Sequence, residues 1–225
     1  MNVILIIPFG QYVNHTTTQL PPEPTGIIGK MHPALFLDRD GVIIENRPDY
    51  VRSWSDVIVF PRALAALARL QTSAFKIIIV TNQSAVGRGL IPLSDANEIN
   101  TRLVTQIKRA GGRVDAVWMC PHAPEDGCDC RKPRPGLLLQ AAEAHSIDLS
   151  RSILIGDALT DLEAGRSAGI PLNILVRTGR GAAQEKMANP SLLNSLLVYN
   201  DLAEALDDLI QRRALLLDGY PGQDR

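Results

Sequence analysis

The sequence ALFLDRDG, residues 34–41, joins a short apolar run to two carboxylates and a glycine. Residues 34–37 have the length and apolarity of a strand that is buried on both faces of a sheet. Asp38 and Asp40 are two positions apart, so an extended backbone places both carboxylates toward the same side. Gly41 allows the chain to turn sharply away. Taken alone, this stretch fits either an acidic turn or a site where two carboxylates share a metal ion and a reacting group.

Four more apolar runs follow, and helical patterns alternate with the runs. The runs cover residues 76–80, 114–119, 153–155 and 172–176, and the helical patterns cover residues 62–70, 96–110, 135–145, 159–168 and 201–212. Alternation of short apolar strands with helices is typical of a parallel sheet covered by helices on both faces. We therefore predict an α/β fold of three layers around a central, mostly parallel sheet.

Length and composition indicate a single domain and argue against some classes of partner. The 225 residues suit one α/β domain, and the 45% hydrophobic share with only 4% aromatic residues predicts an aliphatic core. The formal net charge is −1, so no overall positive field attracts nucleic acid or an anionic membrane. We expect neither partner, and a monomer.

The first thirty residues differ from the rest because an apolar run at 3–9 precedes polar, proline-rich sequence. A bilayer span takes about 20 residues, and no basic region precedes this run as in a secretory signal. We expect a cytoplasmic protein with a flexible N-terminal extension over residues 1–31, a domain over 32–215 and a C-terminal tail over 216–225. Met31 lies so close to the first strand that it is an alternative start.

Further polar residues follow the other predicted strands. Thr81 heads the run Thr-Asn-Gln-Ser at 81–84, Arg131 and Lys132 precede a predicted helix, and Gly-Asp at 156–157 is followed by Asp161. Ligands of open α/β sheets bind beyond the carboxyl ends of the strands, so these residues are expected to meet at one edge. Each group by itself has an ordinary structural explanation, such as a turn or a solvated basic pair; their order is informative.

The order Asp-x-Asp, Thr, Lys and Gly-Asp-x-x-x-Asp resembles the haloacid dehalogenase superfamily of phosphohydrolases over residues 34–179. The resemblance implies a three-layer Rossmann-like fold and an aspartyl-phosphate mechanism. Asp38 is then the nucleophile, and Asp40 protonates the leaving oxygen and later activates water. Thr81 and Lys132 hold phosphoryl oxygens. Mg²⁺ is bound by Asp38, Asp157 and the main-chain carbonyl of Asp40, while Asp161 supports this shell.

The spacing of the motifs predicts how open the site is. Asp38 and Thr81 are 43 positions apart, and Thr81 and Lys132 are 51 apart. Neither interval holds a large cap domain once its helix and strand are subtracted. We expect a capless, open site whose loops supply specificity.

A second metal site is predicted by three cysteines and a histidine within eleven residues: Cys120, His122, Cys128 and Cys130. Thiolates with one imidazole favour tetrahedral Zn²⁺, and four protein ligands make the site structural. Disulfides compete with this interpretation, but three cysteines cannot all pair and a cytoplasmic chain stays reduced. The last ligand directly precedes Arg131, so zinc is expected to hold the loop that carries the two cations.

The zinc-loop string CPHAPEDGCDCRKP at 120–133, with Thr-Asn-Gln-Ser at 81–84 and Val-Arg-Thr-Gly at 176–179, is similar to the D-glycero-D-manno-heptose 1,7-bisphosphate 7-phosphatases. This resemblance implies a small phosphorylated substrate. It would be a sugar bisphosphate of heptose biosynthesis, from which the enzyme removes the 7-phosphate. Substrate contacts are expected from the loop of Asn46 and Tyr50, from Asn82, Gln83 and Ser84, and from Arg131 beside Lys132.

Two positions depart from the family pattern. Ala158 stands where many heptose enzymes have a basic residue, so a contact to substrate phosphate is either lost or taken over by Arg177 or Arg180. Val42 replaces a frequent Thr. The related histidinol-phosphate phosphatases share the zinc loop and are the alternative. A catalytically silent zinc-stabilised binding protein and a nucleic-acid 3′-phosphatase are further alternatives; the retained motifs oppose the first and the balanced charge the second.

Overall fold

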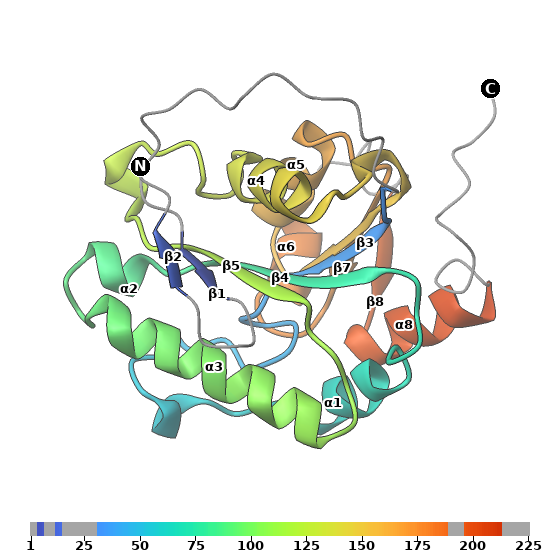
Figure 1. Ribbon diagram of the computed structural model, residues 1–225, viewed down its shortest axis with the longest axis horizontal. Coiled ribbons are helices and arrows are strands. Elements are labelled where there is room, and N and C mark those ends of the chain that lie inside the picture. Colours follow the sequence, from blue (N-terminus) through green and yellow to red (C-terminus); the bar gives the residue numbers. More distant parts are fainter. Residues whose placement is uncertain (1–3, 7–11, 15–30, 189–195, 213–225) are drawn as a thin grey trace.

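The computed structural model describes residues 4–6, 12–14, 31–188 and 196–212. One sheet of eight strands runs through them in the order β2-β1-β5-β4-β3-β6-β7-β8 (Figure 1). The six strands from β5 to β8 are parallel, and β1 and β2 are antiparallel at one edge. The strands are β1 (Ile4–Ile6), β2 (Tyr12–Asn14), β3 (Ala34–Leu37), β4 (Lys76–Asn82), β5 (Ala116–Cys120), β6 (Ile153–Gly156), β7 (Leu172–Val176) and β8 (Leu197–Tyr199).

Helices cover both faces of the sheet, as predicted. The α-helices are α1 (Pro61–Ala68), α2 (Ser84–Gly87), α3 (Leu93–Arg109), α4 (Gly136–His145), α5 (Leu159–Ser167), α6 (Gly181–Met187) and α8 (Leu202–Gln211). Short 3-10 turns occur at η1 (Trp54–Asp56), η2 (Pro124–Asp126) and η3 (Leu149–Arg151). Figure 1 shows α4 and α5 on one side of the sheet and α1, α3 and α8 on the other. The prediction of a three-layer α/β fold is confirmed.

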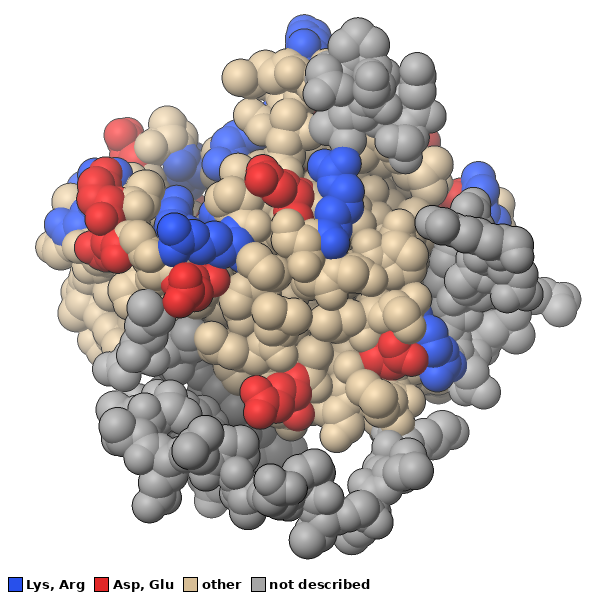
Figure 2. All heavy atoms as spheres, turned by 90° about the horizontal axis from the view of Figure 1, so that it is seen from above, with Lys and Arg blue, Asp and Glu red and all other residues tan. Residues whose placement is uncertain are grey.

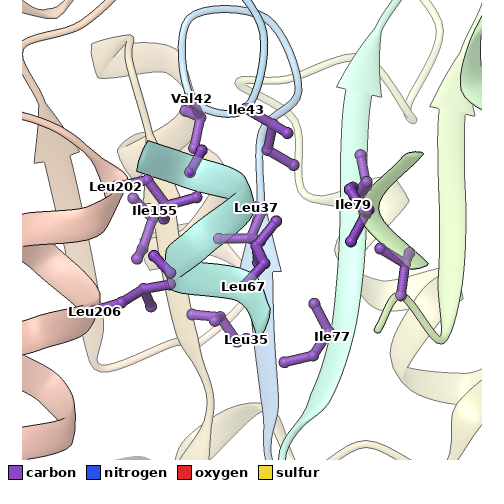
Figure 3. Packing of buried hydrophobic residues seen from close by; sticks show 14 of the residues in the cluster. Leu35, Leu37, Val42, Ile43, Leu67, Ile77, Ile79, Ile155, Leu202 and Leu206 are labelled. Carbon is purple, nitrogen blue, oxygen red and sulfur yellow. The ribbon is translucent and has the colours of Figure 1, made fainter. Parts of the chain in front are cut away.

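The central strand β3 divides its side chains between two aliphatic cores. Leu35 and Leu37 pack with apolar residues of α1, α3 and α8, a cluster shown in Figure 3. Ala34 and Phe36 pack with residues of α4 and α5 on the other face. Because side chains alternate along a strand, the next two residues also separate: Asp38 reaches toward the segment before α4, and Arg39 toward α3.

Several elements differ from the sequence predictions. The backbone of Ile4–Ile6 and Tyr12–Asn14 pairs at the β5 edge, because an open strand edge offers hydrogen bonds to an added strand. The flexible extension over residues 1–31 stays a prediction. The rest of residues 1–30 and the tail at 216–225 lie outside the described residues. Helix α6 and strand β8 were not predicted. Thr81 and Asn82 lie inside β4 rather than after it.

Charge is mixed rather than segregated on the face drawn in Figure 2, where Lys and Arg side chains lie beside Asp and Glu side chains. Among the described residues, no helix combines the length and apolarity that crossing a membrane requires.

Candidate active site

A pocket of about 470 Å³ opens at the carboxyl ends of β3, β4 and β6, where the polar motifs were expected to meet. Neither interval between the motifs contains a separate cap: the first holds a loop, η1 and α1, and the second holds α2, α3 and β5. The pocket is lined by Asp38, Asp40, Asn46, Arg47, Pro48, Tyr50, Val51, Asn82, Gln83, Ser84, Arg88, Pro124, Arg131, Lys132, Thr160, Asp161 and Arg180.

Lys132 joins three motifs through its ammonium group. Its Nζ lies 2.6 Å from Asp38 Oδ1 and 2.7 Å from Asp161 Oδ1, and it donates to the carbonyl of Val80 at 2.8 Å. The Lys132 side chain is only 2% exposed, so all three donors are used inside the protein. Burial by itself lowers the pKa of Lys132, but Asp161 and Asp38 more than offset this and raise it, which keeps the cation charged.

Three carboxylates at the base of the site are close enough to hold one metal ion. Oxygens of Asp38, Asp157 and Asp161 lie within 4.8 Å of one another, and all three residues are buried. Burial raises the pKa of Asp38 to about 7, opposed by Lys132 and reinforced by the neighbouring carboxylates. Burial also raises the pKa of Asp157, opposed by Arg180. Crowded buried carboxylates of this kind fit a hard divalent cation such as Mg²⁺, which prefers oxygen ligands.

The turn after Asp38 is packed against Asp157 without room for a side chain. Gly41 has φ +82°, and a Cβ there would lie 2.2 Å from Asp157 Oδ2. Gly179 has φ +60°, and a Cβ there would lie 2.4 Å from the same oxygen. The backbone N–H of Arg180 donates to that oxygen at 2.8 Å. The two glycines therefore let two loops close around one buried carboxylate.

Asp40 is surrounded by donors from its own motif and from the end of β4 with the residue that follows it. Arg39 Nε donates to Oδ2 at 3.0 Å and Arg39 NH2 donates to Oδ1 at 3.1 Å. Gln83 Nε2 donates to Oδ2 at 2.9 Å, and the hydroxyl of Thr81 lies 3.4 Å from the same oxygen. Thr81 is buried and does not line the pocket, so its hydroxyl contacts Asp40 and Gln83.

The predicted substrate contacts at 82–84 line the pocket, but their polar atoms are used within the protein. The amide of Asn82 bonds both backbone groups of Lys132, at 3.1 and 3.2 Å. Gln83 donates to Asp40, as above. Ser84 Oγ accepts from Arg131 NH1 at 2.8 Å, and the same nitrogen donates to the carbonyl of His122 at 3.2 Å. These residues therefore hold the charged groups of the site in place.

The loop after the first motif also lines the pocket. Asn46 and Tyr50 line the pocket as predicted, and Arg47 lies beside them with its Nε bonded to the carbonyl of Asp56 at 3.1 Å. Arg88 also lines the pocket and pairs with Glu125 at 2.9 Å. Neither arginine was predicted, because nothing local in the sequence distinguishes it from a surface cation.

The two arginines considered as substitutes at Ala158 have different places. Arg177 forms a side-on pair with Glu185, at 2.8 Å for both contacts, and does not line the pocket. Arg180 lines the pocket, and its NH2 lies 3.1 Å from Asp157 Oδ1. Of the two, Arg180 is therefore the one within reach of a ligand.

The second predicted metal site is assembled. Sγ atoms of Cys120, Cys128 and Cys130 lie 3.3 to 3.6 Å apart, and Nδ1 of His122 lies 3.5 Å from Cys120 and 3.3 Å from Cys130. The cysteines are free thiols, and these separations far exceed a disulfide bond of about 2.05 Å. Ligands about 2.3 Å from a tetrahedral zinc lie roughly 3.8 Å apart, so the donor set fits this ion.

Comparison with known proteins gives the same assignment of fold and family. The HAD-hydrolase-like family model matches residues 129–205. The D-glycero-β-D-manno-heptose-1,7-bisphosphate 7-phosphatase of Pseudomonas aeruginosa is 38% identical over 177 residues, which cover 79% of this chain and 97% of that protein.

Solved structures agree with this result. The D,D-heptose 1,7-bisphosphate phosphatase of B. bronchiseptica, complexed with magnesium and phosphate, is 36% identical with a TM-score of 0.75, covering 80% of this chain and 99% of that chain. The corresponding phosphatase of Burkholderia thailandensis is 28% identical with a TM-score of 0.61, covering 79% and 98%. The chain therefore belongs to the D-glycero-D-manno-heptose 1,7-bisphosphate 7-phosphatase family of the haloacid dehalogenase superfamily.

Proposed function

We propose that this phosphatase hydrolyses the 7-phosphate of D-glycero-D-manno-heptose 1,7-bisphosphate through a phosphoryl-aspartate on Asp38. The observation that carries the proposal is the contact of Lys132 with Asp38 at 2.6 Å in a pocket bordered by further cations. A cation there can stabilise the equatorial oxygens of a transferring phosphoryl group. The substrate follows the names of relatives such as the one from Pseudomonas aeruginosa.

The reaction takes two steps on the residues of this chain. A carboxylate oxygen of Asp38 attacks phosphorus, the bond to the sugar oxygen breaks, and Asp40 gives that oxygen its proton. Asp40 then takes a proton from water as the water oxygen attacks phosphorus, and the bond to Asp38 breaks to release phosphate. Lys132 and Arg131 balance charge on the phosphoryl oxygens in both steps.

Mg²⁺ is the proposed catalytic ion, held by Asp38, Asp157 and the main-chain carbonyl of Asp40. When bound, it neutralises charge on the phosphoryl group. The proximity of the three carboxylate oxygens supports this assignment, as does the magnesium in the B. bronchiseptica structure. Asp161 already bonds Lys132 and the N–H of Ala158, so its proposed role is to hold the cation and the turn.

Zn²⁺ is the proposed structural ion at Cys120, His122, Cys128 and Cys130. Four protein ligands fill a tetrahedral shell and leave no position for a reacting water. The ion would hold the loop that ends in Lys132. We also propose that residues 32–215 form the whole catalytic domain, acting as a monomer.

The distal phosphate of the substrate is proposed to contact Arg180, with Asn46, Arg47 and Tyr50 around the sugar. All four residues line the pocket together with Asp38 and Lys132. Arg180 would then supply the positive charge that many heptose phosphatases carry at the position of Ala158.

Phosphate release, measured with Mg²⁺ on both anomers of the heptose bisphosphate and on histidinol phosphate, tests the substrate. Clear preference for a heptose anomer is expected, while preference for histidinol phosphate would refute the heptose assignment. Asp38→Asn tests the mechanism: turnover is expected to vanish, together with the acid-stable phosphoryl mass on the quenched enzyme. Unchanged turnover would rule out the covalent route.

A further inference from the structure

Arg39 is the largest fully buried side chain among the described residues, with 1% exposure. Its guanidinium group contacts Asp40 through Nε and NH2, and NH1 donates to Asn100 Oδ1 at 2.8 Å. Asn100 lies on α3, 61 positions away, and is also 1% exposed. A charged side chain is thus kept inside the protein between a carboxylate of the pocket and one buried amide.

Stability alone does not explain this arrangement. A buried ion pair often contributes no more than well-packed apolar residues of similar volume, because both charges must be removed from water. Asn100 likewise interrupts the apolar face of α3, whose buried residues include Ile99, Leu103 and Ile107. Its amide nitrogen reaches only the sulfur of Met119, at 3.5 Å. The contacts of Arg39 and Asn100 therefore fit a role in holding the Asp40 carboxylate in place better than a role in the hydrophobic core.

The donors around Asp40 are distributed unevenly between its two oxygens. Four donor atoms lie near Oδ2: Arg39 Nε at 3.0 Å, Arg39 NH2 at 3.0 Å, Gln83 Nε2 at 2.9 Å and the hydroxyl of Thr81 at 3.4 Å. Oδ1 receives one hydrogen bond, from Arg39 NH2 at 3.1 Å. A carboxylate oxygen has about two lone-pair positions, so Oδ1 keeps the capacity to carry a proton and Oδ2 does not.

We infer that Arg39, held by Asn100, is a positioning residue that fixes Asp40 so that Oδ1 exchanges the proton in both steps. The inference rests on the proposed acid and base roles of Asp40. A planar guanidinium that bonds both oxygens side-on fixes the rotation of the carboxylate, which a flexible lysine or a single amide does not. Asn100 in turn fixes the plane of the guanidinium through the third nitrogen.

The two steps depend differently on this positioning, which makes it measurable. A sugar alkoxide needs a proton from Asp40 to leave, whereas p-nitrophenolate leaves without one. Formation of phosphoryl-Asp38 from p-nitrophenyl phosphate is therefore insensitive to Asp40. Hydrolysis of phosphoryl-Asp38 needs Asp40 as a base with either substrate.

Arg39→Met is the test variant, because methionine keeps much of the side-chain volume and removes the guanidinium group that bonds Asp40. With Mg²⁺ present, kcat for the heptose bisphosphate is expected to fall about 100-fold or more, the usual weight of a general acid or base, with KM changed by less than about threefold. With p-nitrophenyl phosphate, rapid mixing is expected to show a burst of p-nitrophenolate, larger relative to the steady-state rate than in the wild type.

Arg102→Met makes the same change at an exposed arginine of α3, and wild-type kinetics are expected. If Arg39→Met does not fold, Asn100→Ala tests the same inference. The same burst is expected, with a fall in kcat of about tenfold. A fall in the steady-state rate without a burst, or unchanged kcat, would overturn the inference. A wild type that forms no phosphoryl-Asp38 would overturn the proposed function as well, and the acid-quenched mass distinguishes this case.

Discussion

Asp38→Asn is expected to make the magnesium-free protein more stable while removing its activity. Burial raises the pKa of Asp38 from 3.8 to about 7, even with Lys132 beside it. The folded protein therefore binds the Asp38 proton more tightly than the unfolded chain does. The resulting cost to stability is absent below pH 3.8, grows as the pH rises, and is fully present above about pH 7.

The magnitude follows from these two pKa values. The cost amounts to roughly 2 kcal/mol at pH 5 and roughly 4 kcal/mol at pH 8, from about 1.4 kcal/mol per pKa unit. Asparagine carries no such cost and keeps an oxygen that can accept from Lys132, which also retains Asp161. The weakened contact with Lys132 subtracts a similar amount at both pH values. The advantage of the variant is thus expected to grow by about 2 to 3 kcal/mol between pH 5 and pH 8.

Urea unfolding of both proteins at pH 5 and pH 8, in magnesium-free buffer without a chelator so that the zinc stays bound, measures this difference. Asp129→Asn is the control, because Asp129 is exposed and its pair with Arg134 at 3.3 Å is a surface contact. Saturating Mg²⁺ should reduce the stability advantage of Asp38→Asn, since the ion binds the ionised carboxylate of the wild type. A stability difference that does not change between the two pH values would refute the reasoning.

Three other substitutions test separate parts of the site. Cys130→Ser is expected to lose the bound zinc, by metal analysis, and to lower both Tm and kcat; full activity without zinc would contradict a role in holding the loop. Gly41→Ala is expected to cost at least about 2 kcal/mol in urea unfolding, because its Cβ meets a buried carboxylate, while Gly89→Ala, with φ +67° and open space around it, shows backbone strain only. Arg180→Ala is expected to raise KM for the bisphosphate roughly tenfold relative to p-nitrophenyl phosphate, and Arg177→Ala to leave this ratio unchanged; equal effects would refute the assignment of Arg180.

The sequence predicted the five central strands and the edge of the sheet where the pocket lies. Continuous apolar runs such as 34–37 identify strands buried on both faces, and all residues of β3 are buried. The four candidate zinc ligands could also be predicted, because all of them lie within eleven residues and thiolates with an imidazole favour this ion. Strand β8 was missed because three half-buried residues give no clear period.

What each polar side chain contacts was decided only by the tertiary structure. Asn82, Gln83 and Ser84 follow a strand into the pocket, and this pattern suggested substrate contacts. The structure shows that these side chains also bond Lys132, Asp40 and Arg131, which arrive from other segments; the substrate contacts stay a prediction. A local sequence pattern predicts that these residues lie at the end of a strand. Their hydrogen-bond partners depend on which distant loop packs against that strand end.

The same reason separates the nucleophile from the residues that support it. ALFLDRDG by itself determined a strand that ends in two carboxylates, because alternation and glycine geometry are local properties. That Lys132 reaches Asp38 across 94 positions, and that Arg39 turns away from the pocket to meet Asn100 across 61, follows only from packing α3 and the zinc loop on opposite faces of the sheet. Arg39 meets Asp40 within the motif itself, but the partners that lie 94 and 61 positions away are brought close only by the whole fold.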